Sequence, residues 1–152
     1  MHLLTLSVLP LLAAAANLEL YIPATASLPN PGVLPSSSRA SLSSAGVPIV
    51  VPLTRYNTFV FSGVKPGSYL LSAHSRDTTF EGLRVDIDVN GEGIEEVKAW
   101  TTWSGNEWSN KGEVRGQGEG SARIELRAVA AKVYYQERAT CKFNILQGAN
   151  II

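Results

Sequence analysis

Two stretches of the chain alternate between apolar and polar residues. In residues 82–89 the positions between the apolar residues are charged, and the apolar residues are Leu83, Val85, Ile87 and Val89. Residues 122–129 repeat the pattern. Because successive side chains of a strand point to opposite faces, this period of two predicts strands with one buried face. No comparable length of chain sustains the spacing of a helix.

Short apolar runs separated by turn residues fill much of the remaining chain. Tight turns are expected at residues 65–67 and 90–91, and residues 105–120 are expected to form a polar, glycine-rich loop. Further strands are expected over residues 47–53, 58–61, 68–74, 94–102 and 132–145. Many short strands joined by tight turns predict an all-β domain, and an antiparallel β-sandwich in particular.

The first sixteen residues have the pattern of a signal peptide. An apolar run reaches Leu12, and the alanines from Ala13 to Ala16 are the small residues that a signal peptidase requires, although no Lys or Arg precedes the run. A buried helix or a membrane anchor are the alternatives, but neither this run nor any later one reaches the roughly 20 residues of a membrane-spanning helix. We therefore expect residues 1–16 to be removed near Ala16 and the chain to enter the secretory pathway.

Prolines interrupt the segment that follows. Residues 17–37 are rich in Ser, Ala and Leu and contain Pro23, Pro29, Pro31 and Pro35. Proline disfavours both helices and central strands, so this segment is expected to be an extended lead-in with short strands. The sandwich domain is then expected over residues 38–146, followed by a short tail at residues 147–152.

Charge and rare residue types narrow the chemistry of the domain. The 13 basic and 13 acidic residues balance, and no basic run offers a surface for phosphate backbones, so nucleic acid is not an expected partner. The single cysteine, Cys141, permits no internal disulfide and is expected to be a small buried residue. His74 is the only histidine left after signal cleavage, so a zinc-type site lacks ligands and neither a metal nor a cofactor is expected.

Two polar groups contain the residue types of catalytic or metal sites. Residues 74–77 include His74 and Asp77, but neighbours in sequence rarely place a base within hydrogen-bond reach of a nucleophile. Asp86 and Asp88 share a strand face with Arg84, which offsets their charge, so a solvated face is expected there. The sequence therefore predicts a protein without enzymatic activity.

Aromatic residues with polar neighbours are the best candidates for a contact surface. Trp100 lies on an expected strand and is predicted to pack in the core, whereas Trp103 and Trp108 lie in loop context and suit contact as well as packing. A second aromatic and charged group begins at Tyr134 on the last expected strand. The candidate partner-binding residues are Trp103, Asn106, Glu107, Trp108, Asn110, Lys111, Tyr135 and Arg138.

Three motifs occur in the same order as in one known family. They are the Gly-Ser-Tyr turn at residues 67–69, Gly-Asn-Glu-Trp at residues 105–108 and Tyr-Tyr-Gln-Glu-Arg at residues 134–138. With these motifs the chain resembles ER membrane protein complex subunit 7 over residues 38–146, and it looks like a fungal member. No single motif is diagnostic, but their combination is fairly specific.

The resemblance implies a lumenal β-sandwich of the carboxypeptidase-regulatory or prealbumin-like kind. It implies a non-catalytic scaffold that binds other subunits on the lumenal side of a complex, which inserts the transmembrane helices of tail-anchored and multi-pass proteins into the ER membrane. Family members continue into a transmembrane helix and a cytosolic tail, whereas this sequence stops at Ile152. A genuine stop and a truncated gene model both fit that difference.

Two hypotheses of function follow. The first is docking to another lumenal, β-rich subunit through sheet edges and the aromatic residues of the loop. The second is a secreted module that binds carbohydrate or, in a transthyretin-like manner, a small ligand, since a sandwich with clustered tryptophans suits that function as well. Recovery with ER subunits favours the first hypothesis, and binding on a glycan array favours the second.

Overall fold

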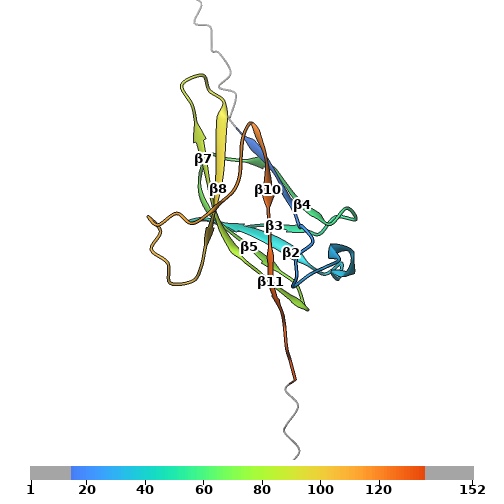
Figure 1. Ribbon diagram of the computed structural model, residues 1–152. Helices are drawn as coiled ribbons and strands as arrows, with labels where there is room; N and C mark the ends of the chain where they lie inside the picture. The colour runs from blue at the N-terminus through green and yellow to red at the C-terminus, as the bar shows by residue number, and fades with distance from the viewer. Residues whose placement is uncertain (1–14, 136–152) are drawn as a thin grey trace, which may run out of the picture.

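The computed structural model describes residues 15–135, which form two packed β-sheets (Figure 1). The elements are β1 (Ala16–Tyr21), the 3-10 helix η1 (Pro31–Val33), β2 (Arg39–Ser43), β3 (Ile49–Pro52), β4 (Thr58–Val64), β5 (Gly67–His74), β6 (Thr78–Phe80), β7 (Gly82–Val89), β8 (Glu95–Thr102), β9 (Val114–Glu119), β10 (Ser121–Glu125) and β11 (Ala128–Ala131). The predicted all-β sandwich is confirmed. No helix within this part of the chain has the length and hydropathy to cross a membrane.

The larger sheet has β7 and β8 at its centre. These strands pair antiparallel from Gly82 opposite Thr102 to Val89 opposite Glu95. β5 and β9 flank them, β2 and β3 extend the sheet beyond β5, and β6 joins β11 to it. Leu83, Val85 and Ile87 of β7 are buried between the sheets, as the alternating pattern predicted. Every pair in this sheet is antiparallel.

The smaller sheet has β1 as its middle strand. β1 pairs antiparallel with β4 and parallel with β10, with Asn17 opposite Ser121. Leu18 and Leu20 are buried and alternate with exposed polar residues, and the prolines begin only after the strand ends. The sandwich therefore starts at Ala16, upstream of the expected boundary at residue 38. Of the predicted signal peptide, residues 1–14 lie outside the described part.

The two sheets meet where β9 turns into β10. Residues 105–120 were expected to form one loop, but residues 114–119 pair with β8 as a strand. A Cβ atom at Gly118 would lie 2.2 Å from the Ser121 carbonyl oxygen, and one at Gly116 would lie 2.6 Å from the Arg123 carbonyl oxygen. Only glycine permits so close an approach. The glycine spacing thus builds a junction between the sheets.

The last predicted strands differ most from the structure. Residues 122–129 form parts of two strands in different sheets, because the chain changes sheet between Glu125 and Ala128. There the Leu126 N–H donates to the Tyr21 carbonyl at 3.0 Å, and the Glu81 N–H donates to the Arg127 carbonyl at 3.1 Å. Residues 132–135 lie outside any strand. The rest of the predicted strand, including Cys141, lies outside the described residues.

Candidate functional site

Residues 103–113, named here the tryptophan loop, connect β8 to β9 and fold against the outer face of the larger sheet. Two turns shape the loop: the Asn106 N–H donates to the Trp103 carbonyl at 3.1 Å, and the Asn110 N–H donates to the Glu107 carbonyl at 2.9 Å. The Asn106 side-chain amide also donates to the Asn110 carbonyl at 3.3 Å. In Figure 1 this loop projects on the side of the molecule opposite η1.

The loop returns to the sheet beside Thr101. The Glu113 N–H donates to the Thr101 hydroxyl, and the Thr101 N–H donates to the Glu113 carbonyl, both at 2.9 Å. A Cβ atom at Gly112 would lie 2.2 Å from the Thr101 hydroxyl oxygen, so this return requires glycine. Both ends of the loop are thereby anchored on β8.

An ion pair on the outer face of β7 attaches the loop to the sheet. The Arg84 guanidinium contacts the Asp86 carboxylate at 2.9 Å through Nε and at 2.8 Å through Nη2. The same guanidinium lies over the Trp108 ring, 4.7 Å from its centroid, and donates to the Trp108 carbonyl. A bidentate pair of this kind fixes both side chains, so Arg84 ties the loop to the sheet.

Asp86 is buried, with 7% of its surface exposed, whereas a solvated face was expected. The difference arises because the loop covers the strand face. Burial opposes ionisation of Asp86, but hydrogen bonds from Arg84 and Ser68, aided by the charges of Arg84 and Lys111, hold its pKa below the ordinary value. Asp86 is therefore a permanent anion beneath the loop at neutral pH.

Trp100 lies on the outer face of the sheet, not in the core as predicted. On β8 the buried positions are Val97 and Ala99, so the period of two turns Trp100 outward, opposite Arg84 on β7. Lys111 of the loop covers the ring, with its Nζ 4.0 Å from the centroid and 3.7 Å from the Asp86 carboxylate. Trp100 thus supports the loop and is half-buried by it.

A groove of about 630 Å³ lies between the tryptophan loop and the sheet. Small residues line one part of it: Ser72, Gly82 and Thr102. Apolar and aromatic side chains form most of the remaining lining: Leu70, Phe80, Trp103, Trp108 and Val129. Trp103 is 64% exposed and Trp108 is 43% exposed. The groove therefore presents two accessible indole rings above small side chains.

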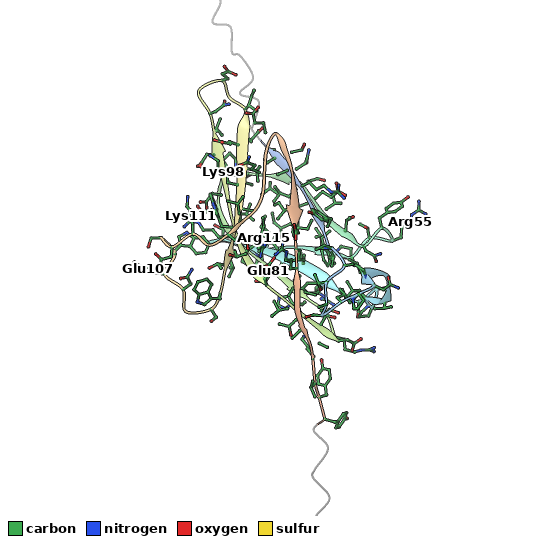
Figure 2. All side chains as sticks on the ribbon, in the orientation of Figure 1. Arg55, Glu81, Lys98, Glu107, Lys111 and Arg115 are labelled. Atoms are coloured by element: carbon green, nitrogen blue, oxygen red, sulfur yellow. The ribbon has the colours of Figure 1, made fainter. Side chains whose placement is uncertain are left out.

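A second ion pair includes Glu81 of the groove lining and was not anticipated from the sequence. Arg115 of β9 contacts Glu81 through Nε at 2.9 Å and through Nη2 at 3.0 Å (Figure 2). The hydrogen bond to Glu81 outweighs the effect of burial and raises the pKa of Arg115. The Arg127 N–H donates to the same carboxylate at 3.1 Å. Neither residue belongs to a local motif, since 34 positions separate them.

The structure brings together six of the eight candidate contact residues. Trp103, Asn106, Glu107, Trp108, Asn110 and Lys111 all lie in the tryptophan loop, with Glu107 and Lys111 on the side opposite Arg55 in Figure 2. Tyr135 is 92% exposed and follows Tyr134, whose hydroxyl donates to the Arg76 carbonyl at the β5–β6 turn. Tyr135 therefore follows a segment that lies beside the β5–β6 turn and is not part of the tryptophan loop. Arg138 lies outside the described residues.

The residues that resembled a catalytic group do not assemble into one. The hydrogen bond from Arg76 to Asp77 lowers the pKa of that carboxyl. The Ser75 hydroxyl accepts a hydrogen bond from the Ser38 hydroxyl at 3.1 Å, so its partner is a hydroxyl and not the imidazole of His74. Within residues 15–135, no group of three or more His, Cys, Asp or Glu residues is placed to hold a metal ion.

Comparison with known proteins agrees with the architecture. A family model described as ER membrane protein complex subunit 7, beta-sandwich domain, matches residues 29–147. That range contains the tryptophan loop and all strands from β2 to β11. No individual curated protein matches the chain. Because the family model covers most of the sequence, the chain belongs to the family of ER membrane protein complex subunit 7.

Proposed function

We propose that this domain is a non-catalytic subunit on the lumenal side of the ER membrane protein complex. In this role it supports insertion of the transmembrane helices of tail-anchored and multi-pass proteins by holding other subunits in place. Family membership supports the assignment to the complex. The observation that carries the docking role is the tryptophan loop, where Trp103 and Trp108 remain accessible on a loop anchored by the buried Arg84–Asp86 pair.

The loop has the chemistry of a protein-binding surface. Tryptophan is enriched among the residues that contribute most to binding, and charged residues are depleted at the centres of interfaces. The ion pair and the Lys111–Trp100 contact hold the loop in one conformation before a partner arrives. Less conformational entropy is then lost on binding, which favours affinity.

Co-purification tests the docking role. The full chain is tagged, expressed in cells, and recovered from detergent-solubilised ER membranes, and the co-purifying proteins are identified by mass spectrometry. We expect the other subunits of the complex with the unaltered chain, and at least about tenfold less of them with Trp103→Ala. Tyr56→Ala is the matched control, because Tyr56 is 71% exposed and lies outside the loop. Recovery of the unaltered chain without other subunits contradicts the proposal.

A glycosylation reporter tests the lumenal location. The chain has no natural Asn-X-Ser/Thr acceptor, and Glu92→Thr places a hydroxyl residue two positions after Asn90. Asn90 and Glu92 lie at the turn between β7 and β8, away from the tryptophan loop. We expect a shift in mobility that is reversed by endoglycosidase H. An unshifted chain that co-fractionates with the ER contradicts the lumenal assignment.

The proposed signal peptide predicts a defined mature N-terminus. Ala16 is fully buried and pairs with Val64 in the smaller sheet, so its removal would shorten the middle strand. The sequence pattern alone predicted removal of residues 1–16, but the burial of Ala16 in the sheet leads us to propose cleavage on the amino-terminal side of this residue, which leaves it in the mature chain. Intact mass spectrometry of the secretory-pathway product measures the position. A mature chain that begins at Asn17 contradicts this expectation.

A further inference from the structure

The groove beside the tryptophan loop is electrically neutral. Glu81 is the only charged residue that lines it, and its carboxylate is paired with Arg115. The nearby Arg84 is paired with Asp86. Burying a charged group against this surface would be costly, because no opposite charge in the lining is available to compensate it. The groove therefore selects an uncharged occupant.

The backbone beneath the groove is already paired. β7 forms antiparallel ladders with β5 on one side and with β8 on the other. A partner that binds on this sheet face cannot gain the main-chain ladder that an added edge strand would form. Its affinity must come from contacts with side chains, and its backbone must be stable without main-chain hydrogen bonds to the sheet.

A polyproline II segment meets both conditions. It has no internal hydrogen bonds, its backbone stays solvated, and proline carries neither charge nor an N–H donor. Aromatic-lined grooves bind such segments by packing indole or phenol rings against the proline rings, and indole N–H groups suit the exposed carbonyls. Trp103 and Trp108 supply these rings on one wall, with Leu70 and Val129 elsewhere in the lining.

The small residues set the depth of the groove. Gly82 of β7 lies opposite Thr102 of β8, and both residues line the groove together with Ser72 of β5. A Cβ atom at Gly82 would lie 3.2 Å from the Thr102 carbonyl oxygen, which leaves little room for any side chain there. Gly82 therefore contributes only backbone to the lining of the groove.

We propose that this groove binds an uncharged, proline-rich segment of a partner subunit in the polyproline II conformation. The inference rests on the proposed docking function and names the chemistry of the segment that docks. The tryptophan loop supplies the wall that recognises the proline rings. The neutral lining excludes segments that carry charge at the bound positions.

Direct binding tests the inference with the purified full chain and fluorescein-labelled decaproline as the probe. Fluorescence anisotropy is followed as protein is added. We expect saturable binding that Trp103→Ala weakens by at least about tenfold and that Tyr56→Ala leaves unchanged. Trp103 is 64% exposed, so its truncation should leave the fold intact, and an unchanged urea midpoint verifies this. A probe with alternating lysine and proline is expected to bind at least about tenfold more weakly.

Three outcomes overturn the inference: no saturable binding of decaproline, equal binding by the Trp103→Ala variant, or equal binding of the lysine-containing probe. Binding of a neutral oligosaccharide such as chitohexaose, lost in Trp103→Ala while decaproline fails to bind, assigns the groove to carbohydrate instead. Co-purification separates this inference from the docking role. Subunits recovered without decaproline binding leave the docking role intact. Decaproline binding without recovered subunits overturns the docking role and the assignment of the segment to a partner subunit, but not the preference of the groove for a proline-rich peptide.

Discussion

Both outer faces of the sandwich place an arginine over an aromatic ring beside a carboxylate, but the two arrangements differ in burial. On the smaller sheet, Arg123 lies 4.5 Å from the centroid of Tyr21, and the Tyr21 hydroxyl donates to Glu125 at 3.2 Å. On the larger sheet, Arg84 lies over Trp108 and pairs with Asp86, and the loop shields the carboxylate from solvent.

The origin of the aromatic ring explains the difference. Tyr21, Arg123 and Glu125 belong to neighbouring strands of one sheet, so their contacts lie on an open face. Trp108 comes from a loop, so the same chemistry attaches a separate segment to the sheet and covers what lies beneath. Exposed pairs contribute little to stability, whereas breaking a buried pair leaves a charge without compensation. Similar groups of an arginine, an aromatic ring and a carboxylate therefore contribute differently to stability on the two faces.

Replacing the two arginines should give the largest difference in stability between the two faces. Arg84→Met should lower the free energy of unfolding by about 3–5 kcal/mol, because Asp86 would lose its bidentate partner and remain buried with only the more distant Lys111 ammonium, 3.7 Å away, to offset its charge. Arg123→Met should lower it by at most about 1 kcal/mol, because an exposed cation–π contact is lost. Urea denaturation followed by circular dichroism measures both. Similar losses for the two variants would contradict the distinction between the faces.

The Glu81–Arg115 pair extends the comparison to one arginine with two partners. Arg115 contacts Glu81, whose side chain is 13% exposed, and Glu113, whose side chain is 67% exposed. Glu81→Gln should cost about 2–3 kcal/mol, since it removes the charge opposite a buried guanidinium and weakens the bond from the Arg127 N–H. Glu113→Gln should cost less than about 1 kcal/mol. Thermal and urea unfolding of both variants measure the two losses of stability. Equal losses for Glu81→Gln and Glu113→Gln would contradict the larger contribution of Glu81.

The buried carboxylate of Asp86 makes the stability of the larger sheet's outer face depend on pH under acid conditions. Its pKa is lowered from 3.8 in the folded chain, so the folded state binds this proton more weakly than the unfolded state. The stability that Asp86 contributes is complete above about pH 4 and is lost as the pH falls through the lowered pKa. Urea midpoints between pH 2 and pH 6 should therefore fall more steeply for the unaltered chain than for Asp86→Asn. Parallel curves would contradict the assignment.

The smallest effect is expected at the lysines. Lys111→Ala removes the cation over Trp100 and should cost about 0.5–1 kcal/mol. Lys98→Ala removes an exposed ion pair with Glu96 and should lower the stability less than Lys111→Ala does. Tryptophan fluorescence distinguishes the two further, because only Lys111→Ala changes the surroundings of Trp100. An unchanged emission spectrum in Lys111→Ala would show that the lysine does not cover the ring in solution.

Periodicity predicted the strands whose apolar side chains are buried between the two sheets. Leu83, Val85 and Ile87 alternate with polar residues, and this signal does not depend on distant contacts. The same period occurs at Leu18 and Leu20, but because prolines follow, the whole of residues 17–37 was predicted to be an extended lead-in and β1 was not recognised. β9 was missed for another reason: its glycines, which normally indicate a loop, are there because the two sheets approach too closely for side chains.

The candidate site was predictable only where its residues are consecutive. Six contact residues from Trp103 to Lys111 lie in one loop, so the sequence alone placed them together. Arg84 approaches Trp108 across 24 positions of sequence, and no local pattern indicates such a contact. Trp100 was assigned to the core because it lies on an expected strand, but the register of β8 turns its side chain toward the outer face.

The parallel pairing of β1 with β10 has a consequence for how the chain is made. Tyr21 and Glu125 are partners separated by 104 positions, so a chain that emerges amino end first presents β1 long before β10 exists. β4 can pair with β1 earlier, but the other edge of β1 stays open until Glu125 has emerged. An open edge of this kind invites pairing with foreign strands. The newly made chain therefore passes through a vulnerable interval, which ends when its carboxyl-terminal third folds back onto its first strand.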